Sequence, residues 1–581
     1  MNTIDLMIVG GYFGFILIAA LIFKRFSKDS SGFIKGGGAM MWWMAGATAF
    51  MTQFSAWTFT GAAAKAYEDG LTVLFIFWGN AIGFFVAAWY FAGRFRQLRV
   101  DTPMEVIRQR FGKVSEQIFT WLQFPLTTFS IAIWLNGLAI FVSAVFGIEL
   151  SVTIIGVGVI VTLISVAGGS WTVSATNVIQ LILLMAITMV AGGYALYAAG
   201  GPAELVRDYP STQVLGDSIQ YWQIGLLWIF FMFTKQTIST NNAMTCYRFL
   251  VTVNEREARK AALVTGLLFV IGPVMWFVPP WVSATHGVDL AAIYPTLGND
   301  ANNAAYVYFV EHHMPNGVLG LILAAMIAAT ISPMTTALNR NAGIFVRNVY
   351  QSLINPNARD AQQLVVGKVV TVVNGVVAIW AALLFASMEE YSFFDLMMLF
   401  GALLQTPLAI PALLAVVVTR TPAWSGWATL LVGLMVSAFM QFVFEVNWLL
   451  PLFNAERFTG REAVDLMVIA SLTAHIVITG GFFLLSSRFY RESHTQHHQA
   501  LTHFVSNLAT PISLDEEAAV DGRQGLYLGK LTQALGVGVG LLVFAPNLPF
   551  DRVAFLLIGG LIFTAGAGLR RPAPTRHSVT E

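Results

Sequence analysis

Two otherwise apolar stretches of the sequence carry runs of hydroxyl and amide side chains, the groups that bind cations and polar solutes. The stretch at 42–66 contains Thr48, Thr52, Gln53, Ser55, Thr58 and Thr60. The stretch at 221–247 contains Thr234, Lys235, Gln236, Thr237, Ser239, Thr240, Asn241 and Asn242. Polar groups are costly in hydrocarbon, so these faces are expected to turn toward protein or a water-filled cavity. Isolated Ser and Thr residues can also join neighbouring helices, but that accounts poorly for a lysine among so many polar neighbours.

Lys235 is the sharpest single clue in the second run. A lysine at the bilayer centre costs about 2.5–3.5 kcal/mol on insertion scales, so something has to compensate for its charge. The partner is either a protein carboxylate or an anionic solute, and no acidic residue lies at comparable depth in the core apolar stretches. Two other interpretations stay open. The side chain extends into an outer vestibule, or it is buried in its neutral form.

The composition places the chain in a membrane. Of its 581 residues 56% are hydrophobic and 11% are charged, whereas soluble domains carry about 25% charged residues. A helix needs about 20 apolar residues to cross the hydrocarbon core. With that length the sequence predicts fifteen spans, at 5–23, 42–66, 71–92, 118–146, 150–168, 175–199, 221–247, 261–284, 316–348, 366–387, 393–418, 424–444, 464–486, 527–545 and 551–569.

Charges between the spans alternate in sign. Basic residues follow odd-numbered spans, for example Arg94, Arg96, Arg99, Arg256, Arg259, Lys260, Arg359 and Arg488. Acidic residues follow even-numbered spans, for example Glu68, Asp69, Asp208, Asp289 and Asp300. Because cytoplasmic loops carry an excess of Lys and Arg, the pattern predicts an outside N-terminus and a cytoplasmic C-terminus. The expected location is the cell's inner (plasma) membrane.

We expect five units along the chain. They are an extra helix and loop at 1–40, a transport core at 41–418, additional spans at 419–486, a polar cytoplasmic linker at 487–526, and further spans with a tail at 527–581. The two polar stretches lie five spans apart, so each begins one of two five-span groups of opposite orientation. Interrupted helices in matching places of two halves are the best sequence pointer to the central site of a transporter.

Other classes of protein fit the sequence poorly. No pair of spans offers a Ser–His–Asp set or metal-ligand spacing, so we expect no enzyme and no cofactor. The single cysteine, Cys246, excludes an intramolecular disulfide. His494, His497, His498 and His503 are irregularly spaced, which favours a solvated linker over a metal site. The lipid bilayer and a small solute are the expected partners, with no nucleic acid.

Four stretches carry a family resemblance. They are "MTQFSAWTFTG" at 51–61, "GGSWTVSATNVIQ" at 168–180, "CYRFLVTVNEREARKA" at 246–261 and "AATISPMTTALNRNAGIFVRNVY" at 328–350. In this order, the four make the sequence similar, over roughly residues 1–480, to the sodium/solute symporter family of sodium/glucose, sodium/galactose and sodium/proline symporters. The resemblance implies an all-α, leucine-transporter-like fold in which the second to eleventh spans form two inverted five-helix repeats.

The resemblance also implies a sodium ion between the second and ninth spans. Its ligands would be the carbonyls of Met51, Phe54 and Ala329 and the hydroxyl of Ser332. The chain departs from the family pattern twice, because Pro333 replaces a second hydroxyl residue and Asn177 replaces an aspartate linked to sodium passage. Proline removes a helix hydrogen bond and frees a carbonyl near residue 329, which partly replaces the lost ligand. Sodium is the expected coupling ion, while proton coupling and uniport stay open.

For the solute, the resemblance to sugar-transporting members implies contacts from Gln53, Thr58, Asn80 and Lys235, with Gln405 as a further candidate. Phe77 stands where the sugar transporters carry a carboxylate, and Lys235 stands where they carry a neutral amide. These two changes shift the charge of the site by two units toward positive. The expected function is therefore sodium-coupled uptake of a small polar solute, namely a sugar, a sugar acid or another carboxylate. A sodium-independent or proton-coupled facilitator is the first alternative, and a membrane sensor module is the second.

Overall fold

The computed structural model describes residues 3–24, 40–100, 102–167, 170–209, 219–388, 393–491, 496–517 and 523–570. Within these residues all regular structure is helical, apart from one isolated bridge between Met40 and Thr252. Segment 25–39 of the expected N-terminal unit, the first two residues of the 168–180 motif, His494 and the tail 571–581 lie outside the described residues.

The first half of the core begins with a helix that breaks in the middle. Its elements are α3 (Trp42–Met51), η2 (Ala56–Phe59), α4 (Gly61–Asp69), α5 (Thr72–Val86), η3 (Ala87–Phe91), α6 (Ala92–Gln97), α7 (Pro103–Phe111), α8 (Lys113–Phe146), α9 (Leu150–Ala167) and α10 (Ser170–Ala198). A short helix, α11 (Pro202–Asp208), leads to the second half.

The second half repeats the order of the first. Its elements are α12 (Trp222–Asn241), η5 (Ala243–Thr245), α13 (Tyr247–Leu250), α14 (Glu255–Trp276), α15 (Val278–Thr285), α18 (Val318–Phe345), η7 (Val346–Ile354), α19 (Asp360–Ala386), α20 (Phe393–Phe400), η8 (Gly401–Gln405) and α21 (Thr406–Val417). Between α15 and α18 lie α16 (Leu290–Ile293), η6 (Pro295–Ala304) and α17 (Ala305–His313).

Helix packing follows the symmetry expected of two repeats. Helix α5 packs on α12, and its counterpart α14 packs on α3; in the same way α8 packs on α19 while α18 packs on α9. Gly79 and Gly83 allow the close approach of α5 to α12, since a Cβ at Gly83 would lie 3.0 Å from the Thr240 hydroxyl. Exchanging the two halves thus preserves both pairings, as inverted repeats require.

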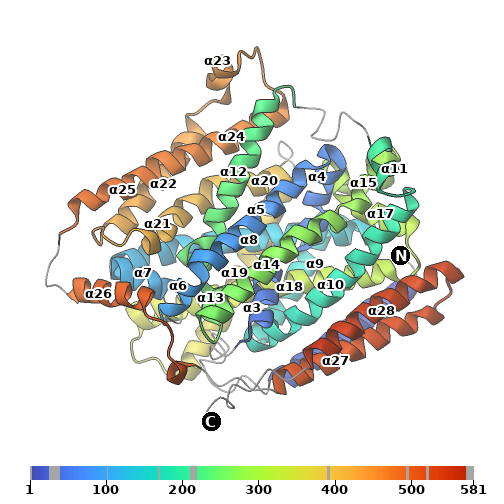
Figure 1. Ribbon diagram of the computed structural model, residues 1–581, viewed down its shortest axis with the longest axis horizontal. Coiled ribbons are helices and arrows are strands. Elements are labelled where there is room, and N and C mark those ends of the chain that lie inside the picture. Colours follow the sequence, from blue (N-terminus) through green and yellow to red (C-terminus); the bar gives the residue numbers. More distant parts are fainter. Residues whose placement is uncertain are drawn as a thin grey trace, which may run out of the picture.

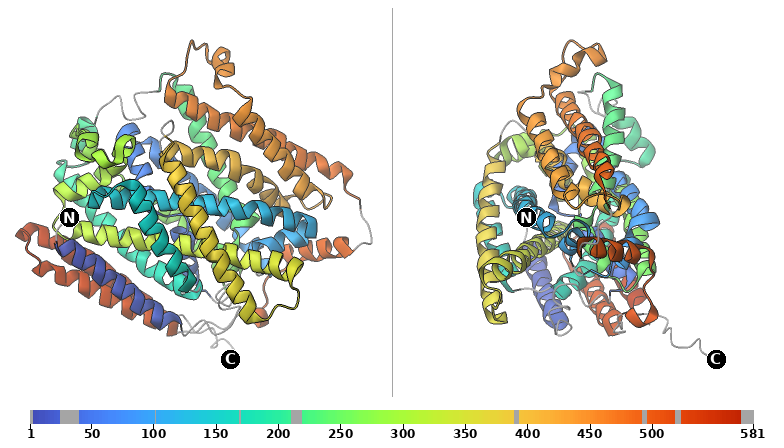
Figure 2. Two further views of the ribbon diagram at one scale, coloured as in Figure 1. Left: turned by 180° about the vertical axis from the view of Figure 1, so that it is seen from behind. Right: turned by 90° about the vertical axis from the view of Figure 1, so that its left-hand side faces the viewer.

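The remaining helices flank this core on two sides (Figure 1). One flank holds α22 (Ser425–Phe442), η9 (Val446–Leu449), α23 (Leu450–Phe453), α24 (Gly460–Ala474), η10 (His475–Gly480) and α25 (Gly481–Ser486). The opposite flank holds α1 (Thr3–Lys24), α27 (Arg523–Gly540), η13 (Leu541–Phe544) and α28 (Pro549–Leu569), and Figure 2 shows α27 and α28 side by side. The Asp5 carboxylate of α1 accepts a hydrogen bond of 2.9 Å from the Gly320 N–H, which fixes α1 to the first turn of α18.

Eleven helices of the described part of the chain are long and apolar enough to cross a membrane. The other four predicted spans are α1, α9 and the two polar stretches. Within the described residues α1 and α9 supply shorter apolar segments, Thr3–Ile16 and Leu150–Leu163. A helix break or polar side chains keep the two polar stretches below these limits. The all-helical class is confirmed, and the count of fifteen spans stays a prediction.

Contacts between loops divide the molecule into two ends. At one end, loops after even-numbered spans meet, as Tyr67 donates to the Val288 carbonyl at 2.7 Å and the Asn316 N–H donates to Asn547 at 2.9 Å. At the other end, loops after odd-numbered spans meet, as Asn254 donates to Glu517 at 2.7 Å. The alternation of charge along the sequence therefore corresponds to two opposite ends of the structure.

The polar linker packs against the second of these ends. Helix α26 (Gln496–Ala509) lies on α6 and α7 and buries Leu501, Phe504 and Leu508. Beyond it, Arg99 donates to the Thr510 and Pro511 carbonyls and, at 2.6 Å, to Glu516, which holds the pKa of that carboxyl below its ordinary value. The described part of the linker is thus anchored to the core and is not wholly solvated.

Candidate functional site

The second span is broken within its polar run. Helix α3 ends at Met51, residues 52–55 are not helical, and the Ser55 hydroxyl caps η2 by accepting from the Trp57 N–H at 3.3 Å. The Ala56 N–H, at the start of η2, donates a hydrogen bond of 2.8 Å to the Thr330 hydroxyl of α18. The break is therefore held directly against the ninth span, as the predicted sodium site requires.

Polar side chains of α10 and α18 meet near the break. Ser332 lies in α18 and donates its hydroxyl hydrogen to the Asn177 side-chain oxygen of α10 at 2.7 Å. Pro333 lies inside the same helix, so the Ala329 carbonyl receives no backbone hydrogen bond from position 333. Met51 and Phe54 flank the break, and both are buried. Neutral carbonyl and hydroxyl oxygens suit a hard cation, so these residues fit a sodium ion.

The seventh span breaks at the last residue of its polar run. Helix α12 is continuous from Trp222 to Asn241 and therefore passes through Lys235 without interruption. The backbone becomes extended at Asn242 (φ −88°, ψ 161°), whose side chain accepts from the Met244 N–H at 2.9 Å and starts η5. The interruption thus lies about two turns beyond the lysine. Lys235 is presented by a regular helix and not by an unwound segment.

The Lys235 side chain turns away from solvent toward the eleventh span. It is 8% exposed, and its ammonium lies 3.4 Å from the Met398 carbonyl and 3.6 Å from the Met398 sulfur. No carboxylate of the described residues forms an ion pair with it. Burial excludes extension into an outer vestibule in this structure. Met398 lies in α20, which ends at Phe400 and continues as the π-helical segment η8.

Gln405 is the predicted solute residue that the structure brings to Lys235. A Cβ built on Gly401 would lie 2.8 Å from the lysine Nζ and 3.9 Å from the Gln405 side-chain oxygen, so the two groups border the same gap. Gly401 and Met398 were missed in the sequence, because a glycine and a methionine in an apolar stretch give no signal of a role. Only the reach of the Lys235 side chain to Met398 and Gly401 assigns one to them.

The other predicted solute residues lie elsewhere in the core. Thr58 is buried in η2 and Asn80 is buried in α5, while Gln53 is partly exposed in the break. No hydrogen bond among the described residues joins any of these three to Lys235. Phe77 stacks on Trp57 with ring centroids 6.2 Å apart, and it also packs edge-on against Trp276. The position at which the family resemblance implies a carboxylate is here part of an aromatic core.

A second group that the sequence did not indicate is a buried cluster of charges. Lys65 and Asp69 of α4 form an ion pair, and Asp69 also receives Arg461 of α24 at 2.7 Å. Arg461 in turn lies 3.4 Å from Asp465. These four side chains are all nearly buried, and they join α4, the second half of the broken helix, to the flank that contains α24. Residues about 400 positions apart cannot be paired from sequence pattern alone.

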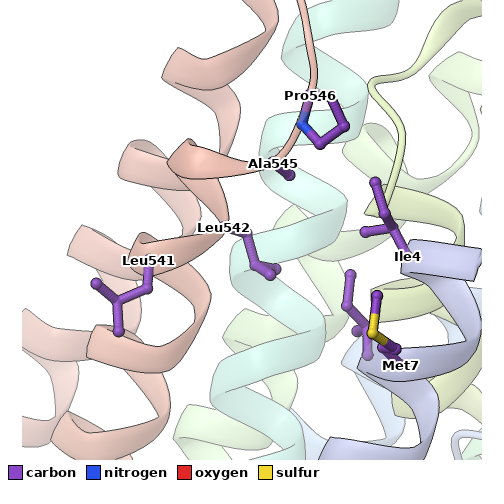
Figure 3. Close-up of a pocket in the computed structure, with 7 residues that line it drawn as sticks. Ile4, Met7, Leu541, Leu542, Ala545 and Pro546 are labelled. Carbon is purple, nitrogen blue, oxygen red and sulfur yellow. The ribbon is translucent and has the colours of Figure 1, made fainter.

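An open apolar cavity of about 410 Å³ lies between α1 and η13, and none of the candidate site residues named above lines it (Figure 3). Its walls are Ile4, Met7, Ile8, Leu541, Leu542, Ala545 and Pro546. Since none of these side chains is polar, the cavity suits hydrocarbon and not the polar solute that the sequence predicts.

Comparison with known proteins identifies the family. The model of the sodium:solute symporter family matches residues 33–433, which is most of the chain. The chain belongs to the sodium:solute symporter family. The predicted resemblance is thereby confirmed, and the protein is a multi-pass membrane transporter of this family.

The similar proteins are sugar and sugar-acid carriers. The sodium/glucose cotransporter of Vibrio parahaemolyticus is 26% identical over 412 residues, covering 65% of this chain and 74% of that protein. The sodium/sialic acid symporter NanT of Aliivibrio fischeri is 26% identical over 447 residues, covering 73% and 85%. A solved Na+-coupled sialic acid symporter, substrate-bound and outward-open, has a TM-score of 0.62 at 21% identity and covers 84% of this chain and 98% of its own. This likeness confirms the inverted-repeat transporter fold.

Proposed function

We propose that this transporter couples an inward sodium gradient to uptake of a small anionic solute, a sugar acid or a related carboxylate. The observation that carries the proposal is the buried ammonium of Lys235, which has only a backbone carbonyl and a thioether as partners. An unpaired charge at this depth is costly, and a solute carboxylate would compensate for it. Sialic acid, the solute named for two of the similar proteins, is itself an anionic sugar.

Sodium coupling is supported by the family and by the donor set at the break. The ion would be held by the Met51, Phe54 and Ala329 carbonyls and the Ser332 hydroxyl, with Gln53, Thr58, Asn80, Lys235 and Gln405 serving the solute. Pro333 and Asn177 favour a second candidate function, a sodium-independent carrier of the same solutes, because they remove one hydroxyl and one anion from the family pattern.

The orientation and the division of the chain are part of the proposal. We place the N-terminus outside and the C-terminus in the cytoplasm of the inner (plasma) membrane, because the basic loops meet at one end of the molecule. The inverted-repeat core at 41–418 carries the transport cycle. The linker at 487–526 lies on the cytoplasmic side.

Uptake by the purified protein in proteoliposomes tests both parts of the proposal. A panel of radiolabelled neutral sugars, sugar acids and simple carboxylates is offered with and without a sodium gradient. We expect a carboxylated sugar to accumulate only with the gradient. Accumulation that ignores the gradient would establish the sodium-independent carrier, and accumulation of neutral sugars alone would contradict the anionic solute.

A further inference from the structure

Gly401 creates the space in which the end of the Lys235 side chain rests. The three residues that border this space, Met398, Gly401 and Gln405, lie on successive turns of α20 and η8, and together they are called here the lysine notch. A Cβ at Gly401 would lie 2.8 Å from both the Nζ and the Cε atom of Lys235. Real Cβ atoms do not approach other atoms so closely, so the notch exists only because residue 401 has no side chain.

The contact that holds the ammonium in the notch is weak. Its distance to the Met398 carbonyl, 3.4 Å, exceeds the usual 2.7–3.2 Å of an N–H···O hydrogen bond. A carboxylate accepts from an ammonium at shorter distance and about twice as strongly as a neutral group does. The four-carbon stem of lysine is flexible, so its charged end can leave the notch without movement of α12. The Gln405 side chain borders the notch and is itself exposed.

We infer that Gly401 sets the affinity for anionic solutes, because it gives Lys235 a resting place from which the solute carboxylate must withdraw the ammonium. This inference rests on the proposed function, since it assumes that the solute is an anion. In the resting arrangement Lys235 joins α12 to α20. Binding of the solute breaks this link, so the free energy of solute binding is less favourable by the free energy of the broken contact.

The variant Gly401→Ala removes the resting place with little other disturbance. Within 4 Å its Cβ would meet Lys235 and, at 3.9 Å, the Gln405 oxygen, and the lysine atoms are the movable end of a flexible side chain. The helices therefore need not separate. We expect the KM for the anionic solute to fall by about three- to tenfold, while the KM of a neutral analogue changes by less than about twofold.

The double variant separates this explanation from a packing effect. In the Lys235→Gln background the Gly401→Ala substitution should leave the KM for the anion unchanged, because no ammonium remains to be displaced. A rise in KM in the single variant would overturn the inference, since the notch would then be the position from which Lys235 binds the solute. An equal change in both backgrounds would also overturn it, since Gly401 would act through helix packing.

A measurement without solute keeps the inference separate from the proposed function. The purified wild type and Gly401→Ala are treated with acetic anhydride, and acetylation of Lys235 is followed by mass spectrometry. We expect at least about threefold faster modification in the variant, with the exposed Lys260 reacting equally in both as the control. Equal rates at Lys235 would overturn the resting place even if anion transport is established. Faster modification without any anion transport would instead refute only the proposed solute.

Discussion

The transporter buries two lysines, Lys65 and Lys235, against the same helix, α20, but the two ammonium groups have different partners. Lys65 pairs with Asp69, which also binds Arg461, and its ammonium lies 5.2 Å from the centre of the Phe394 ring on α20. Lys235 of α12 reaches α20 one turn further along that helix, where its ammonium contacts the Met398 carbonyl and sulfur. Both side chains are less than a tenth exposed.

The comparison distinguishes a structural charge from one that awaits a partner. The cluster around Lys65 contains two cations and two carboxylates, so each cation has a carboxylate partner within the protein. Breaking such a buried cluster is destabilising, because it leaves a charge without its counter-ion. Lys235 has no such counter-ion among the described residues, so its removal costs the fold little. It is therefore expected to affect the solute and not stability.

The largest expected effect is that of Lys235→Gln on solute affinity. An ammonium–carboxylate pair in a desolvated site contributes at least about 1.5–3 kcal/mol. At about 1.4 kcal/mol per decade, its loss raises the apparent Kd of the native anionic solute tenfold or more. Binding to the purified variant and uptake in proteoliposomes both measure this change. A neutral analogue should lose less affinity, and an unchanged affinity for the anion would show that Lys235 does not bind the solute.

The matched substitution Lys65→Gln should act on stability instead. Asp69 keeps Arg461 as a partner, so we expect the free energy of unfolding to fall by about 1–3 kcal/mol, less than for a fully orphaned charge. Thermal unfolding of the detergent-solubilised protein compares this variant with Lys235→Gln, which should unfold at the wild-type temperature. If both variants unfold alike, the distinction between the two lysines is wrong.

A smaller effect is expected of a substitution at the proposed sodium site, because each ligand there is a neutral oxygen. Ser332→Ala removes one of several ligands and should raise the sodium concentration for half-maximal uptake by about fivefold, which corresponds to about 1 kcal/mol. Thr336→Ala is the control, because that hydroxyl donates to the Ser332 carbonyl one turn along the same helix. Equal sodium dependence of wild type and Ser332→Ala would remove Ser332 from the site.

The smallest effect is expected of Asn177→Asp. This substitution restores a carboxylate 2.7 Å from the Ser332 hydroxyl, which attracts the cation but must itself be buried. Because these two terms oppose each other, we expect only a two- to threefold lower sodium concentration at half-maximal uptake, about 0.5 kcal/mol. A sodium titration at pH 7 and pH 8 measures it. A higher half-maximal sodium concentration at both pH values would show that residue 177 does not face the ion path.

The sequence alone determined the class of protein and the two ends of its fold. A chain with 11% charged residues cannot form a water-soluble surface. The alternating charges divide the loops into a basic set and an acidic set. Local polarity also marked the stretch at 42–66 as one that faces the interior, because hydroxyl and amide groups within an apolar stretch have to find partners inside the protein. The motifs at 51–61 and 328–350 predicted the sodium ligands, and the Ala56 N–H joins these two motifs by a hydrogen bond to the Thr330 hydroxyl.

Only the tertiary structure decided which partners these side chains have. The sequence gives no sign that α12 stays regular past Lys235 and breaks at Asn242, since both positions lie in one polar run. The pairing of Asp69 with Arg461, of Ser332 with Asn177 and of Lys235 with the notch at Gly401 joins residues from distant helices. Such contacts depend on how helices cross, and helix crossing is set by the fit of many side chains at once rather than by any local pattern.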